Sequence, residues 1–152
     1  MSVLKQSILR YVAYPLCKGW WFVTRPHTRG VKCLLRCQGK ILLVRPGYGH
    51  RSWSIPGGAI QKDESVLVAA SRELSEEVGI VIPPEQWRVF ATYTQTIEYK
   101  NDTVTCVYAE TNDMQYTVDA FEVVAARWCA IDVLPTPLTP SVRKILTLYE
   151  QA

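Results

Sequence analysis

The sequence predicts a layered α/β or α+β domain in which two helices cover a mixed β-sheet. Apolar runs with strand character dominate the chain, and segments with helical periodicity lie at mid-chain and at the end. No repeat, linker or low-complexity tract interrupts this pattern. A chain of 152 residues with 48% hydrophobic and 20% charged residues is long enough for one core, so we expect a single globular domain.

The first 29 residues form a basic, aromatic extension, which divides the chain into residues 1–29 and a domain of residues 30–152. Five basic side chains and no acidic one fall within the first thirty residues. Helically spaced apolar residues and the cluster Trp20–Val23 leave two interpretations open. The extension either makes weak contact with an anionic membrane surface, or packs its aromatic side chains on the domain or on a second copy to form a homodimer.

The net charge limits the classes of binding partner, and the cysteine usage indicates the cellular compartment. The whole chain carries a formal charge of +3, so the part beyond the first thirty residues carries −2 and offers no basic surface for duplex nucleic acid. The five cysteines are odd in number and lack metal-type CxxC spacing, so we expect buried, reduced thiols in a cytoplasmic protein.

The domain opens with a predicted β-hairpin. Val31–Cys37 and Lys40–Arg45 are rich in Val, Leu and Ile, and Gln38 and Gly39 between them indicate a turn. These two strands are expected to form part of the sheet.

A loop with two glycines follows the hairpin and is flanked by Arg45 and Arg51. A guanidinium donates two parallel hydrogen bonds to a phosphate, which makes both arginines candidates for binding the anionic end of a substrate. The alternative is a solvated surface pair, and the sequence does not decide between the two.

A helix is predicted after the Pro56-Gly57-Gly58 turn, ending at Gly79. Asp63, Glu64 and Ser65 stand where an N-cap and an acidic first turn belong. The apolar stripe of this helix comprises Leu67, Ala70, Leu74 and Val78.

The remaining elements complete the sheet and close the chain. The expected strands are Trp87–Tyr99, Thr103–Glu110 and Val123–Ala130, with a turn at residues 101–102 and a polar loop at residues 111–121. Thr139 followed by Pro140 indicates the start of a final helix. The apolar face of that helix comprises Val142, Ile145, Leu146 and Tyr149.

Three glutamates of the middle helix are the residues that point most directly to a function. Glu73, Glu76 and Glu77 stand at i, i+3 and i+4, so their side chains share one helical face. Like charges packed this closely repel unless a cation gathers them, and Mg²⁺ is commonly held by a few carboxylates together with substrate phosphates. Arg72 stands four residues before Glu76 and can pair with it.

These residues are part of a motif that resembles that of a known family. Gly58, Glu64, Arg72-Glu73-Leu74, Glu76-Glu77 and Gly79-Ile80 fill every fixed position of a 23-residue motif that resembles the Nudix box. The resemblance implies an α/β/α sandwich and a hydrolase that cleaves a nucleoside diphosphate linked to another moiety.

The resemblance also implies the roles of individual residues. Glu73, Glu76 and Glu77, with the backbone carbonyl of Gly57, would hold Mg²⁺, for which Mn²⁺ is a possible substitute. Arg72 would orient these carboxylates, and catalysis is assigned to Glu76, Glu73 and Arg72. Glu64 would either reach the metal through water or favour the helix N-terminus.

The general base and the substrate are left open. Asp113, Asp119 and Glu122 are the acids outside the box that we would test as general base. The expected substrate is a small nucleotide, either a nucleoside triphosphate or a compound of the nucleotide-sugar or ADP-ribose type. The alternative function is a catalytically weak module on the same fold that binds a nucleotide or a partner.

Overall fold

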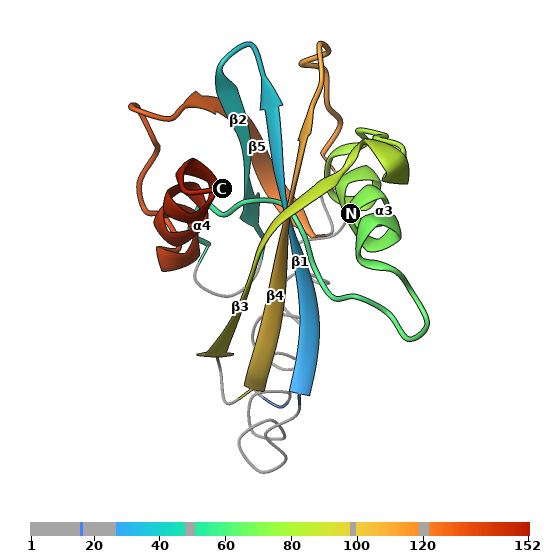
Figure 1. The fold of residues 1–152 in the computed structure, drawn as a ribbon. Coiled ribbons are helices and arrows are strands. Elements are labelled where there is room, and N and C mark those ends of the chain that lie inside the picture. Colours follow the sequence, from blue (N-terminus) through green and yellow to red (C-terminus); the bar gives the residue numbers. More distant parts are fainter. Residues whose placement is uncertain (1–15, 17–26, 48–50, 98–99, 119–121) are drawn as a thin grey trace.

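The computed structural model describes residues 16, 27–47, 51–97, 100–118 and 122–152 (Figure 1). In that part of the chain one mixed sheet has the strand order β3-β4-β1-β2-β5. The elements are β1 (His27–Cys37), β2 (Lys40–Pro46), α3 (Val66–Val78), the 3₁₀ turn η2 (Pro84–Gln86), β3 (Arg88–Ile97), β4 (Lys100–Glu110), β5 (Val123–Ala130) and α4 (Pro140–Glu150). β1 and β4 run parallel, whereas the other neighbouring pairs are antiparallel.

The two helices cover opposite faces of the sheet, as Figure 1 shows for α3 and α4. Successive strand residues point to opposite faces, so each strand serves both helices. The strand residues buried on the α3 side are Val31, Cys33, Leu35, Leu42, Val44, Val107, Ala109 and Val123. Those buried on the α4 side are Leu34, Ile41, Leu43, Val104, Cys106 and Cys129. The predicted α/β/α sandwich is confirmed.

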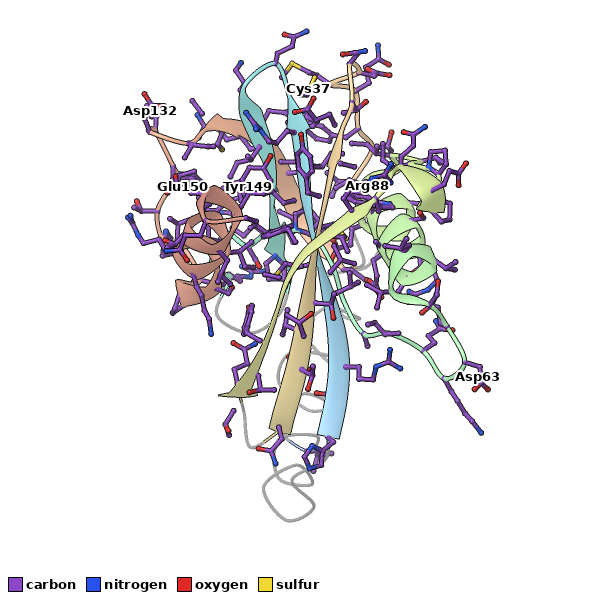
Figure 2. All side chains as sticks on the ribbon, in the orientation of Figure 1. Cys37, Asp63, Arg88, Asp132, Tyr149 and Glu150 are labelled. Carbon is purple, nitrogen blue, oxygen red and sulfur yellow. The ribbon has the colours of Figure 1, made fainter. Side chains whose placement is uncertain are left out.

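The local signals for the two helices act as expected. Ser65 is the N-cap of α3, and its hydroxyl accepts the backbone N–H of Val68 at 3.3 Å. Gly79 ends the helix with φ 67°. Thr139 is the N-cap of α4. At the other end of that helix Tyr149 points toward the sheet (Figure 2), where its hydroxyl accepts a hydrogen bond from Arg36 at 3.3 Å.

Two local expectations are wrong. Asp63 and Glu64 precede α3, whose first turn contains no acidic residue; Asp63 is exposed at the tip of the preceding loop (Figure 2). Asn101 and Asp102 form no turn but lie within β4. The reason is a tertiary contact, because Asp102 accepts the hydroxyl of Thr28 at 2.8 Å and is thereby tied to β1.

The start of the domain lies close to the predicted boundary. β1 begins at His27, so the last three residues of the expected extension already belong to the sheet. The rest of residues 1–29, apart from Leu16, lies outside the described residues, and the membrane and homodimer interpretations stay predictions. In the described part of the chain, no helix is long and apolar enough to cross a membrane.

The sheet opens between β1 and β2, and a later segment fills the opening. The two strands pair at their hairpin end, where residues 36 and 41 face each other. Residues 54–60, which we call the bridging segment, run between them further along. Ser54 and Val44 exchange two backbone hydrogen bonds of 2.9 Å, and Val31 N–H donates to the carbonyl of Gly58 at 2.9 Å. The Pro-Gly-Gly turn is therefore held by both strands.

Candidate active site

The glutamates of α3 lie against the bridging segment. Gly57 N–H donates to Oε2 of Glu77 at 3.0 Å. A Cβ on Gly58 would stand 2.4 Å from Oε2 of Glu73, so the Glu73 carboxylate rests against the bare backbone of that glycine. Glu73 is only 8% exposed and Glu77 is half-buried, whereas Glu76 is exposed. The structure thus brings two of the predicted ligands to the Pro-Gly-Gly turn.

Arg72 ties the helix to the loop before it. Its Nε and Nη2 donate to the two oxygens of Glu64 at 2.8 and 2.9 Å, a bidentate pair. Its Nη1 donates to Glu73 at 2.7 Å and to Glu76 at 3.2 Å, while Nη2 also reaches the carbonyl of Ala59 at 2.9 Å. The expected i,i+4 pair is present, but Glu64 and Glu73 are the closer partners.

Burial and charge shift the pKa values of these acids in opposite directions. The hydrogen bond from Arg72 lowers the pKa of Glu64 to about 2. Burial raises the pKa of Glu77 to about 7, with Glu73 and Glu122 adding to the rise and the Lys32 ammonium and the Gly57 N–H opposing it. Burial also raises the pKa of Glu73, to which Glu76 and Glu122 add and which Arg72 opposes. Burial therefore disfavours the charged forms of Glu73 and Glu77, whereas Arg72 favours that of Glu64.

This donor set fits a hard divalent cation, although the ligands are not gathered in advance. Among the described residues, no group of three or more His, Cys, Asp or Glu side chains is arranged to hold a metal. Glu77 nevertheless bonds to the backbone of Gly57 and Glu73 rests against that of Gly58, and burial opposes the charged form of both, which a cation would favour. Glu76 is exposed, and its bond to Arg72 is the longest that this arginine makes to a carboxylate.

Of the acids predicted as general base, the structure brings one near this centre. Residues 111–118, which we call the strap, follow β4 and pass the end of α3, where Thr117 N–H donates to the carbonyl of Val78 at 2.9 Å. Asp113 is exposed within the strap and accepts a neighbouring backbone N–H. Asp119 lies outside the described residues. Glu122 follows the strap, and its charge acts on Glu73 and Glu77.

Of the two candidate phosphate ligands, Arg45 lies on the opposite face of the sheet from the carboxylates of α3. Arg45 alternates with Ile41 and Leu43 along β2 and therefore lies on the α4 side, where its guanidinium stacks 5.4 Å from the ring centre of Trp53. Its Nε is buried without a hydrogen-bond partner in the described structure. Arg51 is exposed and has a left-handed backbone, with φ 51°.

Lys32 is a site residue that the sequence reasoning missed. Its Nζ donates to the carbonyl of Ile55 at 2.9 Å and to Oγ of Ser54 at 3.3 Å, which fastens the bridging segment from the α4 side. A single lysine within the otherwise apolar run of β1 was a signal that could have identified it, because a charged residue in a central strand needs a partner.

Comparisons with known proteins identify the family. A family model described as the NUDIX domain matches residues 25–149. Phosphatase NudJ of Escherichia coli strain K12 is 38% identical over 64 residues, and the match covers 41% of each chain. The matched region is thus less than half the length of that curated relative.

Solved structures agree on the fold. A MutT NUDIX hydrolase from Burkholderia pseudomallei superposes with a TM-score of 0.73 at 24% identity, over 80% of this chain and 97% of the other. The NUDIX domain of Shewanella oneidensis NrtR, solved with ADP ribose, gives a TM-score of 0.72 at 20% identity and covers 99% of both chains.

Proposed function

The chain belongs to the NUDIX domain family, and from this premise we propose that it is a Mg²⁺-dependent hydrolase of a phosphoanhydride bond. The substrate would be a nucleoside diphosphate linked to another moiety, either a nucleoside triphosphate or a compound of the nucleotide-sugar or ADP-ribose type. One observation carries the proposal: Glu73 and Glu77 meet the Pro-Gly-Gly turn, with Glu77 bonded to the N–H of Gly57 at 3.0 Å.

In this proposal the metal ligands are Glu73, Glu76, Glu77 and the carbonyl of Gly57. A bound Mg²⁺ neutralises phosphate charge and makes water easier to deprotonate. Exposed Glu76 would turn away from Arg72 to complete the set, because its bond to Arg72, at 3.2 Å, is the longest of those carboxylate contacts.

Arg72 and Glu64 would act as positioning residues. The bidentate pair fixes the guanidinium at the loop, and the guanidinium then fixes the Glu73 carboxylate at 2.7 Å. Catalysis depends on such placement, because small displacements of a reacting group reduce the rate strongly.

Glu122 is our proposed general base. It follows the strap, its backbone carbonyl accepts the N–H of Gly47 at 2.9 Å, and its charge acts on two proposed ligands. Asp113 is the weaker candidate, because its carboxylate is engaged in a local turn with Gln115.

The test is product release from a panel of nucleoside triphosphates, sugar nucleotides, ADP-ribose and dinucleoside polyphosphates with Mg²⁺. Glu77→Gln should abolish turnover with the fold intact, because the two side chains are nearly isosteric. The matched control is Glu85→Gln, which makes the same change at an exposed residue of η2 and should keep full activity. Equal turnover by both variants would contradict the ligand assignment.

A second candidate function is a catalytically weak nucleotide-binding module. It is favoured by the contacts of Arg72, which already engage two of the predicted ligands, Glu73 and Glu76. The same panel decides, since nucleotide binding without turnover of any substrate would support the binding module.

A further inference from the structure

The bridging segment changes its partner strand at Ile55. Ser54, before it, exchanges two backbone hydrogen bonds of 2.9 Å with Val44 of β2, whereas the carbonyl of Pro56, after it, accepts the N–H of Cys33 on β1 at 2.9 Å. Among the described residues, neither strand offers a backbone N–H to the carbonyl of Ile55 itself. Ile55 is only 1% exposed, and a buried carbonyl without a partner destabilises a protein. The crossing therefore needs a donor from a side chain.

The side chain of Lys32 supplies this donor. Its Nζ donates to the carbonyl of Ile55 at 2.9 Å and to Oγ of Ser54 at 3.3 Å, and the Ser54 hydroxyl donates to the same carbonyl at 3.2 Å. The ammonium bond is the shorter of the two that this carbonyl accepts, and a bond from a charged donor is the stronger kind. Lys32 is therefore the main fastening of the crossing.

Three consecutive residues of β1 hold the bridging segment. The backbone N–H groups of Val31 and Cys33 donate to the carbonyls of Gly58 and Pro56 at 2.9 Å each. The side chain of Lys32, which lies between them in β1, binds the carbonyl that their backbone groups do not reach. Backbone hydrogen bonds lie in the plane of a sheet and side chains stand out of it, so the lysine holds the segment from the α4 side.

This fastening determines how Gly57 is presented to α3. The carbonyls of the residues on both sides of Gly57 are bonded to β1, whereas its own N–H donates to Oε2 of Glu77 at 3.0 Å. Gly57 has φ 135°, and a Cβ there would stand 2.1 Å from the carbonyl oxygen of Val31, so its backbone lies tightly against β1. A displacement at Ile55, two residues earlier, would therefore move the peptide that meets the glutamate.

The charge of Lys32 also acts on that glutamate. Burial raises the pKa of Glu77, and among the groups that oppose this rise the Lys32 ammonium has the largest influence, ahead of the Gly57 N–H. Lys32 is thus connected to Glu77 both through the bridging segment and through its charge.

We propose that Lys32 is a positioning residue of the active site, which holds the crossing of the bridging segment so that the Gly57 peptide meets Glu77. The inference rests on the proposed function, because Gly57 and Glu77 are two of the proposed metal ligands. In this role Lys32 touches no substrate and acts through the bridging segment.

Stability alone does not explain a lysine at this position. Lys32 is the one charged residue between Val31 and Leu35, and the other four residues of that stretch are buried. Taking an ammonium out of water is costly, and replacing a buried ionic group by an apolar side chain of similar volume is often neutral or stabilising. Packing alone would favour an apolar residue here, so the lysine points to a role in the site.

The first test reads the Gly57 amide directly and needs neither metal nor substrate. The chain has eight glycines, so the full-length protein labelled with ¹⁵N-glycine gives a simple amide spectrum. Lys32→Met keeps an unbranched apolar stem and removes the ammonium. In this variant the Gly57 proton should move upfield, and its exchange with solvent should become about two- to tenfold faster, the range for one hydrogen bond. The amide of Gly39, at the hairpin turn, should not change.

The second test separates placement from substrate binding. With the substrate that the nucleotide panel identifies, Lys32→Met should lower kcat by about tenfold to a hundredfold and leave KM nearly unchanged. A misplaced catalytic group slows the reaction without weakening the binding of substrate. Lys32→Arg should recover most of the lost rate, since arginine keeps the charge and can donate to the same carbonyl.

Two further variants serve as control and as second test. Lys40→Met makes the same change at an exposed lysine of β2 and should leave both the Gly57 amide and kcat unchanged. Ser54→Ala keeps Lys32 and removes one of its two acceptors, so it should give the changes of Lys32→Met to a smaller extent. If Lys32→Met does not fold, Ser54→Ala decides in the same way.

Three results would overturn the proposal. They are an unchanged Gly57 amide in Lys32→Met, equal changes in Lys40→Met, and a rise in KM with kcat unchanged, which would make Lys32 a substrate ligand. Because the amide is read without turnover, failure of the hydrolase proposal appears only in the panel with Glu77→Gln.

Discussion

The two faces of the sheet are built from the same strands and carry opposite chemistry. On the α3 side, Arg72 bonds to Glu73 and Glu76, and Glu77 accepts the N–H of Gly57. On the α4 side the ionisable groups near the bridging segment include Lys32, and hydroxyls accompany it. Because side chains alternate along a strand, a shift of one residue in β1 would move Lys32 to the α3 side, where the glutamates of the helix lie. Register therefore determines chemistry here as much as it determines packing.

The two faces meet at the bridging segment. Lys32 bonds to Ile55 from the α4 side, and Glu77 bonds to Gly57 from the α3 side. Substitutions can therefore be sorted by whether they disturb both faces, one face or neither.

The largest effect is expected where both faces depend on one residue. Gly57→Ala places a Cβ 2.1 Å from the carbonyl oxygen of Val31 at φ 135°, and backbone cannot move away as a side chain can. We expect a loss of about 3 kcal/mol or more in the free energy of unfolding. The loss is measured as a lower midpoint of urea unfolding, with the slope of the unfolding free energy against urea concentration unchanged.

Gly39→Ala is the control for this substitution. Gly39 also has a positive φ, 76°, but nothing lies within 4 Å of the added Cβ. It should cost about 1 kcal/mol, the penalty of the left-handed backbone alone. Equal losses in the two variants would mean that the contact with Val31 does not matter.

The next effect should be confined to the α3 side. Gly58→Ala directs a Cβ at the Glu73 carboxylate, which is the flexible end of a side chain and can move. Stability should change little, whereas the rate should fall by about a hundredfold, since displaced catalytic groups lose that much. A loss of stability as large as that of Gly57→Ala would contradict this expectation, because it would show that the Glu73 side chain cannot move aside.

A smaller effect is expected from Arg72→Lys. Lysine keeps the charge but cannot donate the two parallel bonds that Arg72 makes to Glu64. We expect kcat to fall by about tenfold with KM nearly unchanged, because the guanidinium positions carboxylates and does not bind substrate. A change in KM alone would assign Arg72 to substrate binding.

The smallest effect concerns pH. The pKa of Glu64 is lowered to about 2 in the folded protein, from about 4.3 in a free chain. A depressed folded pKa contributes stability above the unfolded pKa, and that stability is lost as pH falls toward about 2. At neutral pH, Glu64→Gln should cost about 1 kcal/mol, because the pair is part-buried and the amide oxygen of glutamine can still accept one of the two bonds from Arg72.

The pH measurement compares urea midpoints of wild type and Glu64→Gln. The difference between the two proteins should shrink as pH is lowered from about 7 to about 2.5. A difference that does not vary with pH would show that the lost stability comes from packing and not from the charge of Glu64.

Features of the fold that depend on neighbours in sequence were predictable. The caps of α3 at Ser65 and Gly79 are local, and so is the turn at Gln38 and Gly39, where both residues have positive φ. The position of Asp102 was not predictable in this way, because the hydroxyl that binds it belongs to a residue 74 positions away.

In the candidate site, too, some positions were predictable from the sequence and others were not. The spacing of Glu73 and Glu77 predicts their shared face, but the spacing of Arg45 says nothing of which helix its face will meet. The alternation of Arg45 with Leu43 and Ile41 was visible, yet it gains meaning only when those two are seen to pack under α4. The partners of Lys32, which are more than twenty residues away, were likewise hidden.

The strap offers one way in which proteins of this fold could differ in their chemistry. Both of its ends are fastened, Thr111 N–H to the carbonyl of Arg36 and Thr117 N–H to the carbonyl of Val78, so the span between them sets where Asp113 stands. Adding or removing a residue in the span would reposition the acid while every strand and helix kept its place. The length of the loop would then determine where the acid lies, and the chemistry could change while the sheet and the helices stayed the same.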